Sequence, residues 1–125
     1  MVSIFGRNEE AVKQFSTKFA IEPYTKLDTF FSSDQIDAVY IATPHSSHFT
    51  YSLEAIKNNK HILCEKPLTM NYLESMTLLN LAKEAKVFLM EAYMYRTHPQ
   101  TFNILDHLDL FKNTQEKIFI ESSLA

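Results

Sequence analysis

Short apolar runs alternate along this chain with longer segments whose apolar residues recur at helical spacing. The short runs, which predict strands, cover residues 2–5, 38–42, 62–64 and 87–90. The run at 38–42 is apolar throughout, as is typical of a strand buried on both faces of a parallel sheet. Strand and helix alternate about four times, and this order predicts right-handed β-α-β units and a parallel sheet. The expected fold class is therefore α/β.

Polar residues mark the boundaries of the first predicted helices. Asn8 is placed to cap a helix, with two acidic residues in the first turn that complement the helix dipole. The expected buried face of this helix consists of Val12, Phe15 and Phe19. Pro23 is expected to break the chain, and a short helix is predicted at about residues 27–32.

Two later helices carry similar signals. Ser46 or Ser47 is expected to cap a helix that ends at the asparagine pair 58–59, since asparagine tolerates the left-handed conformation. Asn71 and Glu74 resemble a capping box at the start of the next helix. The apolar face of the first is expected to be Phe49, Leu53 and Ile56, and that of the second Leu78, Leu81, Ala82 and Ala85.

The pattern changes after residue 90. Pro99 suits the first turn of a helix, whose apolar face would be Ile104, Leu105, Leu108 and Phe111. Residues 117–122 then alternate, which suits a sheet with one solvated face and hence the first strand of a second, α+β domain. We therefore expect a first domain over residues 1–112 and the start of a different domain over 113–125.

Composition narrows the class of protein. The chain has 125 residues, 46% of them hydrophobic and 22% charged, which suits one globular domain with its own core. A net charge of −3 argues against nucleic acid as a partner. No apolar run approaches the roughly 18 residues of a membrane span, and no signal peptide is recognisable. Cys64 is the one cysteine, so no internal disulfide forms and a cytoplasmic setting is expected.

Gly6 is the one glycine of the chain. A doubly wound fold normally uses glycine at turns and in the loop that binds phosphates. This chain therefore cannot contain a glycine-rich phosphate loop. We expect that asparagine and aspartate serve at its turns and that the glycine-rich portion of the fold is missing.

The segment 64–68, Cys-Glu-Lys-Pro-Leu, carries the strongest indication of chemistry because it follows a predicted strand. In open parallel sheets, loops at the carboxyl ends of the strands form the ligand crevice. A lysine amine with a lowered pKa exchanges protons near neutral pH, so Lys66 is a candidate to relay a proton or orient a substrate hydroxyl. The alternative is a surface lysine paired with Glu65. Cys64 is expected to be a buried apolar filler.

The segment 43–48, Thr-Pro-His-Ser-Ser-His, follows the preceding predicted strand. Thr43 and the backbone groups near it are candidates to contact a ribose or a nicotinamide, with His48 at the helix start. His45 and His48 are three residues apart, but zinc needs further ligands that no second cluster offers, so no metal site is expected. The alternative is a capped helix with histidines at its polar N-terminus.

Arg7 follows the first predicted strand. If that strand is the second strand of a dinucleotide-binding fold, an arginine here accommodates the 2′-phosphate of NADP. The alternative is a solvated arginine beside two glutamates. The segment 91–96, Glu-Ala-Tyr-Met-Tyr-Arg, follows the last parallel strand and is either pocket lining or, more often for such clusters, core packing.

Together these segments resemble the Gfo/Idh/MocA family of NAD(P)-dependent oxidoreductases. The resemblance rests on residues 38–44, His48, 60–68 and 91–100 in this order and spacing, and the last segment is closest to the dihydrodiol and xylose dehydrogenase branch. It implies a Rossmann-type doubly wound parallel sheet, incomplete here. It also implies hydride transfer between a nicotinamide, NADP(H) more than NAD(H), and a sugar, polyol or cyclic alcohol. The full-length form would be a homo-oligomer.

The resemblance also implies roles for individual residues. Lys66 would be the catalytic lysine that positions and polarises the substrate hydroxyl, and a cis Lys66–Pro67 bond is one way to hold its loop. Arg7 would lie at the adenosine end of the cofactor and Arg96 near the nicotinamide or substrate. Eight residues are implied to contact the cofactor or to hold the loop of Lys66: Arg7, Thr43, Pro44, His48, Glu65, Lys66, Pro67 and Arg96.

The chain departs from the family at both ends. The first strand, the glycine-rich loop and the first helix would precede residue 1, and most of the substrate domain would follow residue 125. The chain is therefore expected to be an internal piece of such an enzyme. The resemblance implies a partial dinucleotide-binding domain over residues 1–112 and the start of a truncated substrate and oligomerisation domain over 113–125. A non-catalytic, truncated or degenerate nucleotide-binding domain is the competing interpretation. A small interaction module related by fold alone is a third, which leaves the ordered motifs unexplained.

Overall fold

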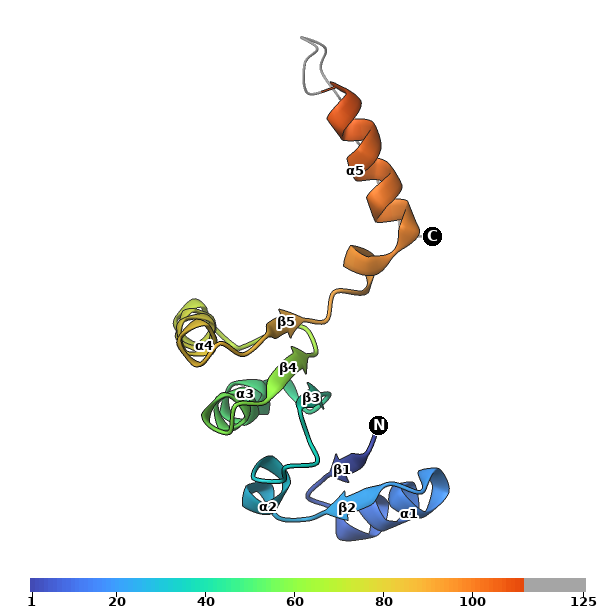
Figure 1. Ribbon diagram of the computed structural model, residues 1–125, viewed down its shortest axis with the longest axis vertical. Helices are drawn as coiled ribbons and strands as arrows, with labels where there is room; N and C mark the ends of the chain where they lie inside the picture. Colours follow the sequence, from blue (N-terminus) through green and yellow to red (C-terminus); the bar gives the residue numbers. More distant parts are fainter. Residues whose placement is uncertain (112–125) are drawn as a thin grey trace. The chain divides into compact units, whose positions relative to one another are not determined.

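Strands and helices alternate in the computed structural model, which describes residues 1–111 (Figure 1). The chain divides into two compact units, Met1–Ala92 and Tyr93–Ala125. The first unit contains β1 (Ser3–Phe5), α1 (Glu9–Phe19), β2 (Glu22–Tyr24), α2 (Leu27–Phe31), β3 (Ala38–Ile41), the 3₁₀ turn η1 (His45–Ser47), α3 (His48–Lys57), β4 (His61–Cys64), α4 (Tyr72–Ala85) and β5 (Leu89–Glu91). The second contains the 3₁₀ turn η2 (Met94–Thr97) and α5 (Pro99–Phe111). The predicted α/β class is confirmed.

All strand pairs in the described part of the chain are parallel, as the sequence predicts. β1 pairs with β2, and β3, β4 and β5 form a second sheet in that order. In the second sheet, Ile41 pairs with Cys64 and Cys64 with Glu91, so the carboxyl ends of the three strands meet at one edge. This edge carries the loops that the sequence singles out for chemistry.

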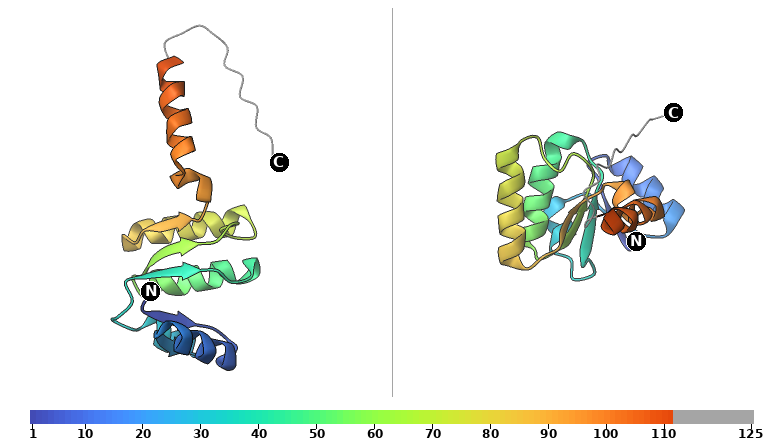
Figure 2. Two further views of the ribbon diagram at one scale, coloured as in Figure 1. Left: turned by 90° about the vertical axis from the view of Figure 1, so that its right-hand side faces the viewer. Right: turned by 90° about the horizontal axis from the view of Figure 1, so that it is seen from above.

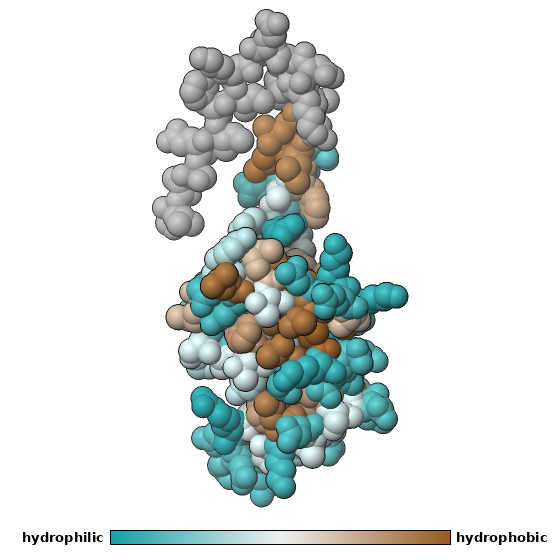
Figure 3. Space-filling model, turned by 90° about the vertical axis from the view of Figure 1, so that its left-hand side faces the viewer, coloured by the Kyte–Doolittle hydropathy of each residue, from teal (hydrophilic) through white to brown (hydrophobic). Residues whose placement is uncertain are grey.

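The core of the first unit lies between the β3–β4–β5 sheet and the helices α3 and α4. Figure 2 shows the two helices side by side on one face of this sheet. Ile62 of β4 and Leu78 of α4 are buried, with 1% and 0% of their surfaces exposed. Burial of such a side chain contributes about 1.5–3 kcal/mol. On the outer surface, hydrophobic patches are separated by hydrophilic side chains (Figure 3).

The expectation that the run at 38–42 is buried on both faces is wrong within the first unit. Val39 and Ile41 are buried, but Tyr40 is 60% exposed, and Leu63 of the neighbouring strand is 39% exposed. Side chains alternate between the two faces of a strand. The described elements of this unit cover only the face that carries α3 and α4.

The expectation that Pro23 only breaks the chain is also wrong. Pro23 is the middle residue of β2 and lies opposite Ile4 of β1. Proline cannot donate a backbone hydrogen bond, so strands tolerate it where no donor is required, as at a sheet edge. β2 is such an edge, because β1 is its one neighbour in the described sheet.

Most predicted helix boundaries are confirmed. The Asn8 side chain accepts the Ala11 N–H at 3.0 Å, and the Asn71 side chain accepts the Glu74 N–H at 3.0 Å. Asn59 takes the left-handed conformation with φ 57°, as expected for an asparagine after a helix. Ala20 and Lys86 do the same at φ 52° and 56°, which their residue types do not indicate.

Ser47 lies at the N-cap position of α3, but its hydroxyl does not cap the helix. It is directed instead to the Pro44 carbonyl, at 2.7 Å. The turn η1 explains this, because the Ser47 N–H already bonds to the same carbonyl at 2.9 Å.

The predicted buried faces of α1 and α3 are only partly correct. Val12 is buried, whereas Phe15 and Phe19 are 37% and 49% exposed and contact one another, with ring centroids 4.4 Å apart. In α3 the buried hydrophobic residues are Ala55 and the predicted Ile56, and the predicted Phe49 and Leu53 are half-buried against the core. The strand predicted at 117–122, and the domain start at 113–125, lie outside the described residues.

No helix of the described part of the chain is long and apolar enough to cross a membrane.

Candidate cofactor and catalytic site

The loops after β1, β3 and β4 carry the candidate site residues. Arg7 follows β1, Thr43 follows β3, and Lys66 follows β4. The carboxyl ends of β3 and β4 lie on the same side of one sheet, and β1 belongs to the other sheet. Ligands of open α/β folds bind at the carboxyl ends of the strands. All three loops belong to the first unit.

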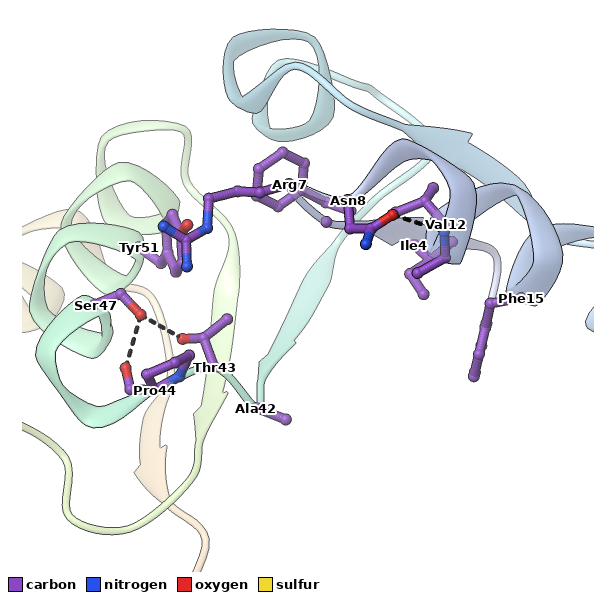
Figure 4. A pocket seen from close by; sticks show the side chains of 13 residues that line it. Ile4, Arg7, Asn8, Val12, Phe15, Ala42, Thr43, Pro44, Ser47 and Tyr51 are labelled. Carbon is purple, nitrogen blue, oxygen red and sulfur yellow. Dashed lines mark hydrogen bonds between the residues drawn. The ribbon is translucent and has the colours of Figure 1, made fainter.

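A cavity of about 450 Å³ lies between the end of β1 and the end of β3 (Figure 4). It is lined by Ile4, Phe5, Gly6, Arg7, Asn8, Ala11, Val12, Phe15, Ala42, Thr43, Pro44, Ser47 and Tyr51. Apolar side chains thus form much of the wall, with polar groups from Arg7, Asn8, Thr43 and Ser47. Such a mixture is typical of small-molecule and cofactor sites.

Gly6 is one of the residues that line this cavity. A Cβ atom at this position would lie 2.7 Å from Cγ2 of Val12, which is closer than real Cβ contacts. Glycine therefore lets the start of α1 lie close against the end of β1. This close approach places Arg7 and Asn8 at the cavity wall.

Arg7 is an exposed residue, and it forms part of the cavity wall. Figure 4 shows its guanidinium directed toward Ser47 and Tyr51 of the opposite wall. Within residues 1–111, no carboxylate forms an ion pair with it. The exposed side chain also fits the alternative of a solvated arginine beside two glutamates, and the guanidinium has donors available for a ligand.

Thr43 and Ser47 form a small hydroxyl pair at the other wall. The Ser47 hydroxyl lies 2.9 Å from the Thr43 hydroxyl and 2.7 Å from the Pro44 carbonyl. A hydroxyl donates one hydrogen. If Ser47 donates to the carbonyl, the Thr43 hydroxyl donates to Ser47 and presents its lone pairs outward.

Glu65 holds the loop of Lys66 from one side. The Tyr40 hydroxyl donates to Oε1 of Glu65 at 2.5 Å, and the Lys66 N–H lies 3.2 Å from Oε2. These two bonds, with that from Tyr40 the larger effect, lower the pKa of the Glu65 carboxyl. The same contact raises the pKa of the Tyr40 hydroxyl. Glu65 is therefore a loop anchor as well as a neighbour of Lys66.

Glu91 holds the loop from the other side. Its Oε1 accepts the Leu68 N–H at 2.7 Å, and the loop lies between this bond and the backbone bond from Glu65 N–H to the Ile41 carbonyl at 2.9 Å. The bond between Lys66 and Pro67 is cis. The loop is thus held at both ends by hydrogen bonds to the neighbouring strands β3 and β5.

His48 connects this loop to the one after β3. Its Nδ1 lies 2.8 Å from the Pro67 carbonyl and its Nε2 2.9 Å from the Thr43 carbonyl. The side chain is fully buried and is not part of the cavity wall. The proposed contact of His48 with a cofactor remains a prediction.

The Lys66 side chain itself is exposed, at the centre of these anchors. In the part of the chain that the structure describes, its ammonium group has no ion-pair partner. The ion pair with Glu65 considered in the sequence is not formed. An exposed amine on a held loop is available to a bound ligand.

Other candidates lie elsewhere. Arg96 is exposed in η2 of the second unit. Cys64 is buried, and this burial raises the pKa of its thiol to about 11, as fits an apolar filler. Among residues 1–111, no three His, Cys, Asp or Glu side chains converge as metal ligands.

Two anchors were not identified from the sequence as holding the loop. Tyr40 lies within a continuous apolar run, and its register opposite Leu63 places it beside the next strand's end. Glu91 was considered only as part of a possible pocket lining. The signal for both is a polar group at or near the carboxyl end of a strand adjacent to the Lys66 loop.

Comparison with known proteins identifies the family. Residues 1–93 match the Gfo/Idh/MocA family, described as an oxidoreductase family with an NAD-binding Rossmann fold. The match covers more than half of the chain, so the chain belongs to this family.

The relatives include sugar-related enzymes. The chain is 33% identical over 109 residues to a dTDP-3,4-didehydro-2,6-dideoxy-alpha-D-glucose 3-reductase from Actinomadura kijaniata, covering 87% of this chain and 33% of the relative. It is 35% identical over 98 residues to D-xylose 1-dehydrogenase (NADP(+)) from Hypocrea jecorina, covering 78% of this chain and 25% of the relative. It is 32% identical over 105 residues to trans-1,2-dihydrobenzene-1,2-diol dehydrogenase from Danio rerio, covering 83% of this chain and 31% of the relative.

Solved structures agree with this placement. A 3-ketoreductase from Actinomadura kijaniata in complex with NADP and TDP-benzene matches with a TM-score of 0.80 and 33% identity, over 88% of this chain and 34% of that one. The Rossmann-type fold is thus confirmed. The chain spans about a third of the length of the curated relatives it matches, and less of some.

Proposed function

We propose that this chain is the cofactor-binding part of an NADP(H)-dependent oxidoreductase that acts on a sugar, polyol or cyclic alcohol. The observation that carries the proposal is the Lys66 loop, held by Glu65, Glu91 and His48 with its amine exposed. A catalytic amine needs a defined position relative to the reacting atoms. Membership of the oxidoreductase family supports the same conclusion.

In this proposal Lys66 orients the substrate. A bound nicotinamide supplies hydride exchange at the carbon that bears the hydroxyl. The Lys66 ammonium hydrogen-bonds to the substrate oxygen and favours the charge that develops there. Tyr40 and Glu91 act through the loop, since they touch Glu65 and Leu68 and not the amine.

Arg7 is proposed to select the cofactor. The cavity fits an adenosine end, because an apolar wall and the hydroxyl pair of Thr43 and Ser47 face a guanidinium that has no carboxylate partner within the described residues. A guanidinium matches the geometry and charge of a phosphate group. Two of the relatives named above carry NADP in their names or complexes, which favours NADP(H) for this chain.

The remaining features of the proposal concern the whole protein. We expect a homo-oligomer in the cytoplasm, with a small-molecule substrate and neither nucleic acid nor membrane as partner. Thr43 and Pro44 would border the cofactor from the wall opposite Arg7, and Arg96 would approach the nicotinamide or substrate. The competing function is a non-catalytic nucleotide-binding segment. The glycine content favours it, because Gly6 is the one glycine of the chain and a glycine-rich phosphate loop needs several.

Titration of the chain with NADPH and NADH, followed by nicotinamide fluorescence, tests the cofactor. We expect saturable binding that is tighter for NADPH. Arg7→Ala should weaken NADPH binding by about 10- to 100-fold, the loss expected for a charge-assisted bond to phosphate, and leave NADH binding nearly unchanged. Lys13→Ala is the matched control, because Lys13 is an exposed cation of α1 outside the cavity wall. Equal losses for both cofactors in Arg7→Ala would contradict the selectivity role.

Turnover tests the role of Lys66 in the full-length protein that carries this segment. Lys66→Met removes the ammonium but keeps much of the side-chain volume, and should lower kcat by about 100-fold or more with little change in NADPH affinity. Lys83→Met, at an exposed position of α4, serves as the control. Undiminished turnover in Lys66→Met would favour a non-catalytic role for the loop.

A further inference from the structure

The two ring nitrogens of His48 both face backbone carbonyl oxygens. Nδ1 lies 2.8 Å from the Pro67 oxygen and Nε2 lies 2.9 Å from the Thr43 oxygen. Carbonyl oxygens accept hydrogen bonds and cannot donate them. Each contact therefore requires a hydrogen on the histidine nitrogen.

Only one protonation state satisfies both contacts. A neutral imidazole carries a hydrogen on one nitrogen and a bare lone pair on the other, whereas the imidazolium donates from both. A neutral His48 would direct a lone pair at an oxygen lone pair in one of the two contacts. Turning the ring over would place carbon atoms at both oxygens and lose both bonds.

His48 is fully buried, so an unmatched contact has no water to relieve it. An unsatisfied buried polar group costs about 1–3 kcal/mol. A buried cation is also costly unless it is hydrogen-bonded and charge-compensated. Both ring nitrogens of His48 are hydrogen-bonded, and His48 is the smallest of the effects that lower the pKa of the Glu65 carboxyl.

Ionisable residues of two segments lie near His48. His45 belongs to η1, with its ring centroid 5.5 Å from that of His48. Glu65 and Lys66 belong to the loop after β4, in which Lys66 directly precedes Pro67, whose carbonyl His48 contacts. Glu65 is tied to Tyr40 and to the backbone of its own loop. Its ionised form is the one that these bonds favour.

The two carbonyls belong to different strand ends. Thr43 lies in the loop after β3 and lines the cavity. Pro67 lies in the loop after β4 and directly follows Lys66. We propose that His48 is a positioning residue that, as a buried imidazolium, fastens the loop of Lys66 to the loop of Thr43. Its role in catalysis rests on the proposed function, but the doubly donating clamp does not.

Nitrogen NMR of the histidine rings tests the clamp directly on this chain. With ¹⁵N-labelled histidine, long-range proton–nitrogen spectra distinguish a ring with two protonated nitrogens from one with a bare nitrogen. We expect both nitrogens of His48 to be protonated at pH 7. The other four histidines are exposed, so Gln or Asn substitutions at each in turn identify the His48 signals without disturbing the core.

His61 provides an internal contrast. Its Nδ1 accepts the Phe88 N–H at 2.9 Å and therefore carries no hydrogen in this structure. The same spectrum should show His61 with one bare nitrogen and His48 with none. A bare nitrogen on His48 at pH 7, in a chain whose other signals show it to be folded, would overturn the proposal.

A variant separates positioning from packing. In His48→Gln the side-chain amide carries both of its donor hydrogens on one nitrogen, whereas the imidazolium donates from two separate nitrogens, so we expect the glutamine to lose at least one of the two contacts. In the full-length protein we expect kcat to fall by about tenfold, because the Lys66 amine is less well placed, while the Kd for NADPH changes less than about twofold. Unchanged kcat would overturn the positioning role.

The clamp and the proposed function fail separately. Two protonated nitrogens on His48 with no NADPH binding would uphold the clamp and count against the oxidoreductase proposal. NADPH binding with a neutral His48 would do the reverse.

Discussion

The Tyr40 hydroxyl donates to Glu65 from a neighbouring strand, and the two residues are 25 positions apart in the chain. This bond is the largest of the effects that lower the pKa of Glu65. A carboxyl whose pKa is lower in the folded state stabilises that state above its unfolded pKa of about 4.3. The contribution is lost as the pH falls through the folded-state pKa, so this anchor of the Lys66 loop weakens in acid.

Replacement of Tyr40 tests this contact. Tyr40→Phe removes the donor and keeps the ring, so the pKa of Glu65 should rise toward its ordinary value, and the loop anchor should be lost at a higher pH than in the parent chain. Carbon NMR of the Glu65 carboxyl against pH measures the change. Tyr72→Phe is the control, since Tyr72 is an exposed tyrosine of α4. A Glu65 pKa that is the same in Tyr40→Phe as in the parent would show that the bond is not formed in solution.

At the scale of single elements, side-chain caps define where helices begin. Asn71 accepts the Glu74 N–H at 3.0 Å, and the Glu74 carboxylate accepts the Met70 N–H at 3.2 Å. In a capping box the glutamate accepts the N–H of the cap residue itself, whereas here it accepts the N–H of Met70, the residue before the cap. It also joins the end of the Lys66 loop to the start of α4.

Loss of the cap should weaken the whole first unit, because α4 supplies Leu78 to its core. Asn71→Ala is expected to lower the free energy of unfolding by about 0.5–2 kcal/mol. Urea unfolding measures this. Asn80→Ala, at an exposed position within α4, removes an asparagine that caps nothing and should not destabilise the chain. Equal effects of the two substitutions would argue against the cap.

At the scale of the whole molecule, one core supports the site in the first unit. α3 and α4 cover one face of the β3–β4–β5 sheet, and the loops at the carboxyl ends of these strands rest on that packing (Figure 2). His48 belongs to the same layer, since it lies at the start of α3 and is fully buried. Core stability and loop position are therefore linked.

A cavity in this core should destabilise the unit. Leu78 is fully buried and Leu79 is 46% exposed, although both lie on α4. Leu78→Ala should cost about 2–5 kcal/mol of unfolding free energy, and Leu79→Ala well below that. Thermal or urea unfolding of the two variants makes the comparison. Similar losses would mean that α4 does not pack as the structure shows.

Much of the fold could be predicted from local patterns. Helical spacing identified the helices, apolar runs identified β1, β3, β4 and β5, and the asparagine caps marked the starts of α1 and α4. β2 was missed because Pro23 reads as a break when the pairing of the strand is unknown. The exposed side of Tyr40 and Leu63 was missed because an apolar run does not reveal whether a second layer covers the strand.

The sequence by itself determined the order of elements and the placement of Lys66, Thr43 and Arg7 after strands, since helix and strand periods and caps are local properties of the chain. Only the tertiary structure decided what holds the Lys66 loop. Tyr40 and Glu65 are 25 positions apart in the chain, Leu68 and Glu91 are 23 apart, and His48 and Pro67 are 19 apart. Such contacts depend on strand register and helix packing, which bring distant residues within hydrogen-bond distance only after the sheet has formed.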